Sequence, residues 1–195
     1  MHQTEQKRYS KTTALVLCGI FAALMAICSF ITIPLGFTPV PINLATLGVF
    51  LTGGILGKKY GSISLIVYIL LGAVGVPVFA GFKGGLGVLA GPTGGYIIGY
   101  LAAAFLTGLL VELVFTKTGT DSGQRSAKSS TSRFIGIILA MIAGLAACYA
   151  LGTAWFMIST GTGLGAALIS CVIPFLPGDA AKIIVGALLV QKLRP

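Results

Sequence analysis

Long apolar stretches separated by short basic clusters constrain this chain more than any other feature of its sequence. A transmembrane helix needs about 20 mostly apolar residues. Six such stretches occur, at residues 12–33, 41–57, 60–74, 96–115, 134–160 and 178–191. Only 9% of the residues are charged, against about 25% in soluble proteins, and the mean hydropathy is +1.01. The sequence therefore predicts an all-α integral membrane protein with six transmembrane helices.

The positions of the basic residues predict the orientation of the chain. With six spans, all lysines and arginines except Lys83 and Lys182 fall on one side: in the two tails, at residues 58–59 and at residues 117–133. Short loops rich in Lys and Arg stay in the cytoplasm. We therefore expect a multi-pass protein of the prokaryotic plasma membrane with both termini inside. This pattern also accounts for the net charge of +9 without a nucleic-acid partner.

The domain organisation follows from the same pattern. We expect cytoplasmic tails at residues 1–11 and 193–195, with a single membrane domain at residues 12–192 between them. Within that domain, the hydrophilic stretch 116–132 predicts a flexible cytoplasmic linker. A seventh span at residues 162–175 would spoil the charge pattern, so we interpret this region as a partly inserted outer segment that ends at Pro174 and Pro177.

The outer link at residues 75–96 is apolar and rich in glycine, unlike a solvated loop. Irregular backbone at membrane depth is tolerated where it is buried in protein or lines a cavity. We interpret this link as a lid that folds inward over an outward-facing pocket, with Phe79, Lys83 and Tyr96 as candidate contacts. A mobile glycine linker is the alternative, and the large side chains of Phe79 and Tyr96 argue against it. The Gly-Pro-Thr-Gly-Gly run at residues 91–95 lacks the Lys-Ser/Thr ending of a phosphate-binding loop.

An acid and a base lie one helical turn apart in the last apolar stretch. Ionisable residues inside a membrane are costly and usually mark a functional site, and side chains at i and i+3 share a helix face. Asp179 and Lys182 therefore suit a polar clamp for a small ligand, with Lys182 facing an anionic or carbonyl group and Asp179 facing N–H donors. The alternative is a self-neutralised structural pair that caps the helix.

Other candidate residues are aromatic or small. Tyr149 and Trp155 could form walls of the pocket, although Trp155 also suits the membrane interface, and Asn43 is a further polar contact. Small residues recur every fourth position in the first helix, which allows close packing in lipid. They are Ala14, Cys18, Ala22 and Ala26. We expect the cysteines to be packing residues rather than metal ligands, because their spacing fits no zinc motif.

Four motifs in this order give the chain a resemblance to a known family. They are Gly-x-Pro-Val-Phe-Ala-Gly at residues 75–81, Gly-Pro-Thr-Gly-Gly-Tyr at 91–96, Tyr-x-x-Gly-x-x-Trp at 149–155 and Pro-Gly-Asp-x-x-Lys at 177–182. The chain resembles BioY, the biotin-specific substrate-binding S component of energy-coupling factor (ECF) transporters, from about Lys11 to its C-terminus. One departure is that Asn43-Leu44-Ala45 stands where the family commonly has Thr-x-Gln.

The resemblance implies a six-helix protein that binds biotin near the outer surface and is not an enzyme. It implies no cofactor, since the ATP is used by two ABC ATPases that act with a transmembrane coupling protein of the EcfT type. It also implies that Ala22 and Ala26 dock onto that coupling protein, and that Asp179 and Lys182 line the biotin site. A homo-oligomer remains open.

Three alternatives to this function are considered. The fold could serve another small vitamin or a biotin precursor. An intramembrane enzyme could use Asp179 and Lys182 as acid and base, although no nucleophile, paired acid or metal cluster accompanies them. A scaffold subunit would show no stabilisation by a ligand.

Overall fold

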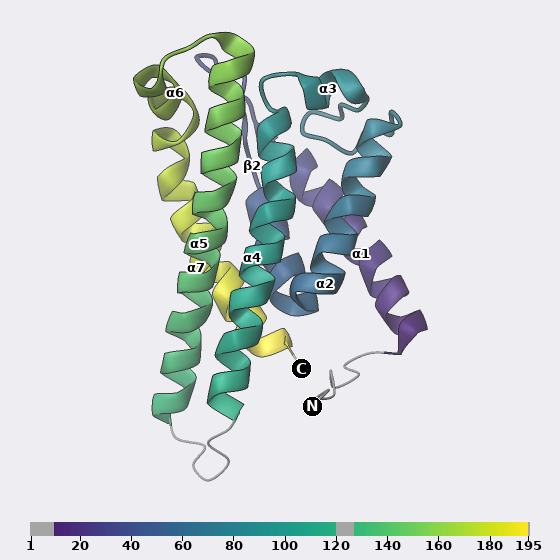
Figure 1. The fold of residues 1–195 in the computed structure, drawn as a ribbon, viewed down its shortest axis with the longest axis vertical. Helices are drawn as coiled ribbons and strands as arrows, with labels where there is room; N and C mark the ends of the chain where they lie inside the picture. Colours follow the sequence, from purple (N-terminus) through teal and green to yellow (C-terminus); the bar gives the residue numbers. More distant parts are fainter. Residues whose placement is uncertain (1–9, 120–126, 195) are drawn as a thin grey trace, which may run out of the picture.

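The structure is a computed structural model that describes residues 10–119 and 127–194 (Figure 1). Its helices are α1 (Lys11–Phe30), α2 (Ala45–Ala73), α3 (Leu86–Ala90), α4 (Gly94–Gly119), α5 (Ala127–Thr160), α6 (Leu164–Cys171) and α7 (Leu176–Leu193), with a 3-10 turn η1 at Ile173–Phe175. Two short strands, β1 (Thr32–Ile33) and β2 (Ile42–Asn43), pair in an antiparallel fashion between α1 and α2.

The long helices expose large apolar side chains instead of burying them all. Leu15 on α1, Leu139 on α5 and Leu188 on α7 are each more than half exposed. Such surface would be an aggregation hazard in water, but it is the normal outer face of a bundle in lipid. Within the described part of the chain, five candidate spans are long and apolar enough to cross a membrane, at Lys11–Phe30, Ala45–Ala73, Gly94–Thr116, Ser130–Thr160 and Leu164–Leu193. The prediction of an all-α membrane protein is confirmed at this level.

Helix α2 is sharply broken at Gly57 and folds back on itself. The φ angle of Gly57 is 82°, a conformation that glycine adopts without the strain of a Cβ atom. A Cβ atom added at Gly61 would lie 3.0 Å from the carbonyl oxygen of Thr52, nine residues away, which a straight helix with a rise of about 1.5 Å per residue would not permit. The two arms of α2 correspond to the predicted spans 41–57 and 60–74.

Charged side chains hydrogen-bond to backbone N–H and C=O groups beside this break in the helix. Glu112 of α4 accepts a hydrogen bond from the backbone N–H of Lys58 at 3.1 Å, and Arg194 donates to the carbonyl of Gly54 at 2.7 Å. Unpaired groups at helix ends need such partners when they are buried. The charged residues Glu112 and Arg194 thereby fix the turn between the two arms.

The segment predicted to be partly inserted is helical and packed. Within α6 and η1, Ala167, Cys171 and Phe175 are buried. Pro174 lies in η1 and Pro177 in the first turn of α7, where proline is tolerated because the first N–H groups of a helix lack intrahelical partners. The breaks therefore fall at the prolines, as expected.

The predicted linker 116–132 overlaps the ends of two helices. Helix α4 continues to Gly119 and α5 begins at Ala127, while residues 120–126 lie outside the described part of the chain. The predicted N-terminal tail at residues 1–11 lies mostly outside it too, at residues 1–9. Of the predicted C-terminal tail at residues 193–195, only residue 195 lies outside, because α7 extends to Leu193 and Arg194 is buried.

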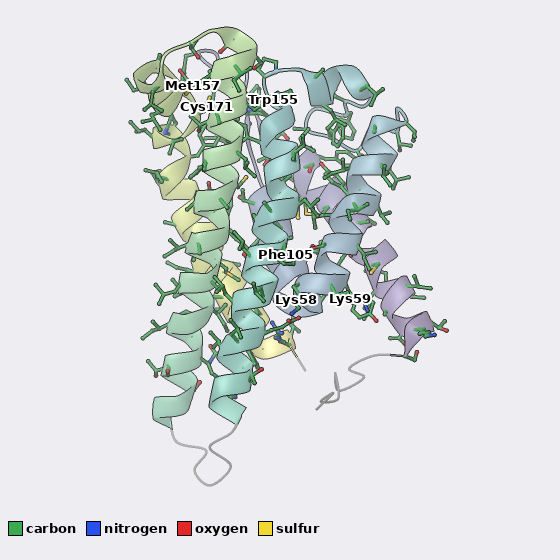
Figure 2. The ribbon with its side chains drawn as sticks, viewed as in Figure 1. Lys58, Lys59, Phe105, Trp155, Met157 and Cys171 are labelled. Carbon is green, nitrogen blue, oxygen red and sulfur yellow. The ribbon has the colours of Figure 1, made fainter. Side chains whose placement is uncertain are left out.

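The two ends of the bundle differ in character. The β1–β2 pair, α3 and α6 gather at one end (Figure 1). Lys58 and Lys59, at the break of α2, lie toward the opposite end (Figure 2). The irregular segments that follow α1 and precede α4 thus meet on the same side of the molecule.

The small residues of α1 mostly face the interior of the chain. Ala14, Cys18 and Ala22 are buried, and Ala26 is half-buried against the same core cluster. In this conformation the stripe packs within the chain, chiefly against α2, and docking through Ala22 and Ala26 stays a prediction.

Candidate functional site

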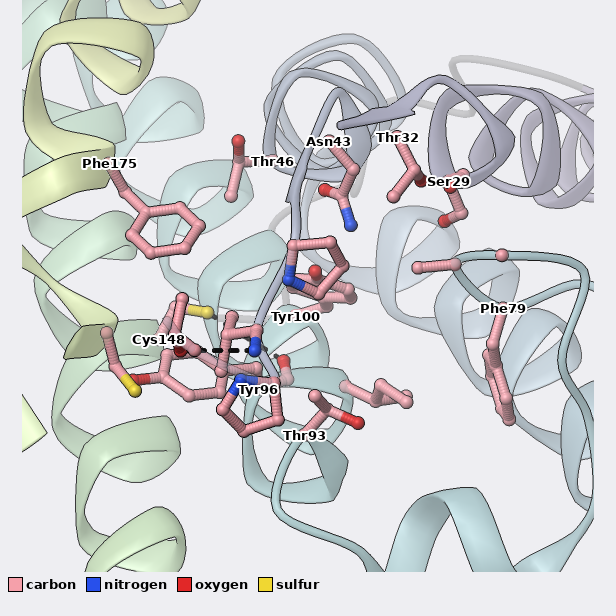
Figure 3. A pocket seen from close by; sticks show the side chains of 18 of the residues that line it. Ser29, Thr32, Asn43, Thr46, Phe79, Thr93, Tyr96, Tyr100, Cys148 and Phe175 are labelled. Carbon is pink, nitrogen blue, oxygen red and sulfur yellow. Dashed lines mark hydrogen bonds between the residues drawn. The ribbon is translucent and has the colours of Figure 1, made fainter. Parts of the chain in front are cut away.

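A cavity of about 240 Å³ lies at the end of the bundle that carries the irregular segments. Its walls come from the β1–β2 region, the 75–96 link, and helices α2, α4, α5, α6 and α7 (Figure 3). The predicted residues Asn43, Phe79, Lys83, Tyr96, Tyr149, Asp179 and Lys182 all line it. Segments from every part of the sequence therefore converge on one pocket.

The charged pair lies at one side of this cavity and is buried. Asp179 is 2% and Lys182 is 9% exposed, and the distance between Lys182 Nζ and Asp179 Oδ1 is 2.8 Å. Burying either charge alone would be strongly unfavourable, whereas a hydrogen-bonded pair is tolerated. The pair is therefore held in place by mutual neutralisation while still facing the pocket.

Two hydroxyl groups complete the hydrogen bonding of Asp179. Thr46 donates to Oδ1 at 2.8 Å, and Tyr149 donates to Oδ2. Lys182 Nζ also donates to the Thr46 hydroxyl at 3.1 Å. These four residues form a network that links α2, α5 and α7, which we call the Asp179 cluster.

The N-terminus of α7 positions this pair but is not capped by it. Asp179 lies in the first turn, and the N-cap position is Phe175, which makes no side-chain capping hydrogen bond. The carboxylate of Asp179 accepts hydrogen bonds from Thr46, Tyr149 and Lys182 instead. An acidic group in the first turn still gains from the positive end of the helix dipole. The expectation that Asp179 caps the helix by hydrogen bonding is therefore wrong, whereas the expectation of an ion pair is correct.

The 75–96 link folds inward over the cavity as predicted. The Phe79 ring is 1% exposed and packs edge-on against Tyr68 of α2, with ring centroids 5.5 Å apart. Backbone bonds close a tight turn between Phe79 and Lys83, in which Phe79 N–H donates to the Lys83 carbonyl at 2.9 Å. At the tip of this turn, Phe82 stacks on Phe30 of α1 at 4.4 Å. We call residues 75–93 the lid.

Tyr96 of the predicted link and Trp155 of the predicted pocket wall have different roles in the structure. Tyr96 is 6% exposed, lines the cavity and shares a hydrogen bond with Thr153 at 3.1 Å. Trp155 does not line the cavity. Its indole N–H donates to the carbonyl of Gly91 at 2.9 Å, so Trp155 anchors the end of the lid. The prediction of a wall residue is wrong for Trp155.

Asn43 lines the cavity, and its side chain also hydrogen-bonds to the backbone. Its side-chain oxygen accepts a hydrogen bond from the N–H of Ala45 at 3.0 Å, at the start of α2. This bond resembles the turns that Asn forms two residues ahead of itself. The Asn43 side chain also hydrogen-bonds to the Tyr100 hydroxyl, so a ligand would meet these two groups together.

Several polar residues of the site were not predicted from the sequence. Thr46 belongs to the Asp179 cluster, and Ser29 shares a buried hydrogen bond with Tyr68 at 2.8 Å. Tyr100 and Thr93 also line the cavity (Figure 3). One available signal was the position of Thr46, one helical turn after Asn43 at the outer start of the second span.

The arrangement suits binding rather than bond-breaking chemistry. The cavity offers acceptors at Asp179, donors at Lys182 and Asn43, and apolar or aromatic walls such as Phe79 and Phe175. Ligand sites typically combine apolar walls with a few placed polar groups. Among the residues that the structure describes, no group of three His, Cys, Asp or Glu residues could hold a metal ion.

Comparisons with known proteins agree on one family. The model of the BioY family matches residues 2–195. A biotin transporter BioY from Thermotoga maritima is 39% identical over 181 residues, covering 92% of this chain and 95% of that protein. A biotin transporter BioY from Rhizobium etli is 37% identical over 179 residues, covering 91% of each.

A solved structure supports the same relation. The crystal structure of an S-component for biotin from an ECF-type ABC transporter superposes with a TM-score of 0.77 at 32% sequence identity, and the match covers 98% of this chain and 94% of that chain. The family indicated by the four sequence motifs is confirmed.

Proposed function

The chain belongs to the BioY family, and from this premise we propose that the cavity under the lid is a biotin-binding site. The protein is the S component of an ECF-type biotin transporter and not an enzyme. The observation that carries the site assignment is the Asp179 cluster, a buried and hydrogen-bonded charge pair that faces the cavity. The predicted ligand contacts retained here are Asp179, Lys182, Asn43, Phe79, Lys83, Tyr96 and Tyr149.

The chemistry of biotin matches the two kinds of surface in this cavity. Its ureido ring carries two N–H donors and a carbonyl acceptor, and its fused rings are otherwise apolar. Asp179 can accept from the ureido N–H groups and Lys182 can donate to the ureido carbonyl, while Phe79 and Tyr96 cover the apolar faces. A site of buried hydrogen-bonding groups rejects analogues that leave those groups unpaired.

We assign six membrane crossings to a single domain at residues 12–192, with the cavity facing outward. The two arms of α2 on either side of Gly57 count as separate crossings, so both termini lie in the cytoplasm. Among the described basic residues, Lys58 and Lys59 lie toward the end opposite the cavity (Figure 2), as the positive-inside rule expects.

Uptake requires partner subunits in this proposal. A transmembrane coupling protein of the EcfT type and two ABC ATPases supply the energy from ATP, because an S component for biotin belongs to an ECF-type ABC transporter. The chain itself uses no cofactor in this scheme. Since Ala22 is buried, docking through Ala22 and Ala26 requires α1 to move relative to α2. A homo-oligomer remains compatible with the exposed apolar faces.

A competition experiment tests the proposed ligand against the main alternative, another vitamin. Binding of radiolabelled biotin to the detergent-purified chain should saturate and should be displaced by unlabelled biotin, but not by thiamine or riboflavin. Biotin at 100 times its Kd should also stabilise the protein by about 2.7 kcal/mol. If biotin showed no saturable binding and another labelled vitamin did, the ligand would be reassigned while the fold stayed intact.

A further inference from the structure

The cavity holds one more positive charge than the Asp179 cluster needs. Three of the residues that line it carry a full charge, namely Lys83, Asp179 and Lys182. Lys182 and Asp179 neutralise one another. The ion pairs among the described residues join Lys58 to Glu112 and Lys182 to Asp179, so neither involves Lys83. The surplus charge matches a ligand with a single anionic group.

The lid fixes the backbone of Lys83 and leaves its side chain exposed. The turn between Phe79 and Lys83 is closed by backbone hydrogen bonds at both residues. Its inner side is held by the buried Phe79 ring, and its outer side is held by the stacking of Phe82 on Phe30. Lys83 is exposed yet lines the cavity, which places this residue at the mouth.

Lys83 and the Asp179 cluster belong to opposite sides of the cavity. Figure 3 shows Phe79 of the lid across the pocket from Phe175, the residue that immediately precedes α7. A ligand that is polar at both ends can therefore contact α7 with one end and the lid with the other. Biotin has this form, with a ureido ring at one end and a carboxylate on a flexible chain at the other.

We propose that Lys83 binds the carboxylate of biotin at the mouth of the cavity, while the Asp179 cluster holds the ureido ring. The inference rests on the proposed function. Lys182 is a poorer partner for the carboxylate, because a second anion would have to share one ammonium group with Asp179, which lies 2.8 Å from it. Two carboxylates in one buried site repel each other, and this repulsion favours placing the ligand carboxylate at Lys83.

The test compares two ligands that differ in the charge of the tail, biotin and biotinamide. Their Kd values are measured by calorimetry on the detergent-purified full chain, for the wild type, Lys83→Gln and Lys83→Arg. Exposed ion pairs contribute modestly, so Lys83→Gln should weaken biotin by about two- to fivefold and leave biotinamide unchanged. Lys83→Arg should restore most of the biotin affinity. Lys59→Gln makes the same charge change at an exposed position toward the opposite end of the molecule and should affect neither ligand.

Salt gives a second readout that a purely structural role would not produce. An exposed pair is screened by salt, so added NaCl should weaken biotin binding to the wild type more than to Lys83→Gln. An equal loss for both ligands in Lys83→Gln, or no loss for biotin, would overturn the inference. If the wild type bound neither biotin nor biotinamide, the proposed function itself would fail.

Discussion

At the scale of single residues, the Asp179 carboxylate organises the site. It accepts hydrogen bonds from Thr46, Tyr149 and Lys182, which come from three different helices. These partners supply hydrogen bonds to a buried carboxylate, where an unpaired charge would be costly. The site is therefore arranged before a ligand arrives, which lowers the entropy lost on binding.

The pairing of Asp179 with Lys182 predicts a non-additive response to mutation. Lys182→Met should destabilise the ligand-free protein by about 3–5 kcal/mol, because it leaves a buried carboxylate without its cation. The double variant Asp179→Asn with Lys182→Met should recover much of that loss, although neither variant should retain full biotin affinity. Thermal unfolding in detergent measures the difference. Equal unfolding temperatures for the single and double variants would show that the pair is not coupled.

The sequence identified the charged residues of the site and Tyr149, but not the threonine hydroxyl beside them. Asp179 and Lys182 stand out because charges are rare in apolar spans. A threonine in such a span does not stand out, since it can bond to the carbonyl four residues earlier, as Thr52 does with Gly48. The residue type alone does not separate Thr52 from Thr46, whose hydroxyl donates to a residue 133 positions away.

At the scale of elements, the lid depends on one close approach between a helix and a ring. A Cβ atom at Gly72 of α2 would overlap the Phe79 ring. Gly72→Ala should therefore displace Phe79 and, through overpacking of about 1–3 kcal/mol, weaken biotin binding by about tenfold. Gly87→Ala, on the short helix α3 of the same lid, meets no atom within 4 Å and is the matched control. Calorimetric Kd values for both variants check the prediction, and it fails if Gly72→Ala binds biotin as tightly as Gly87→Ala.

The long elements were predictable and the short ones were not. Hydropathy located the main spans, and Lys58 and Lys59 marked the break of α2 because charges favour the end of a span. The β1–β2 pair and α3 are too short to carry a periodic signal. The surrounding segments are held by tertiary contacts such as the stacking of Phe82 of the lid on Phe30 at the end of α1, which no local pattern reveals. The anchoring role of Trp155 was missed for the same reason, since its partner is a backbone carbonyl at Gly91.

At the scale of the whole molecule, the two ends of the bundle differ. At one end, the lid, the β1–β2 region and α6 surround the cavity. Toward the other end, Glu112 and Arg194 hydrogen-bond to the backbone around the break of α2. This asymmetry suits a protein that captures a ligand on one side of a membrane and relies on partner subunits to carry it across.

A calorimetric titration with biotin tests the central claim most directly, using the wild-type chain beside Asp179→Asn. The substitution keeps the size of the side chain but removes the charge that orders the cluster, and hydrogen bonds to charged groups contribute about 1.5–3 kcal/mol. We expect one biotin per wild-type chain and binding about 10- to 100-fold weaker in Asp179→Asn, with the variant still folded. Biotin affinity unchanged in Asp179→Asn would contradict the assignment of the site.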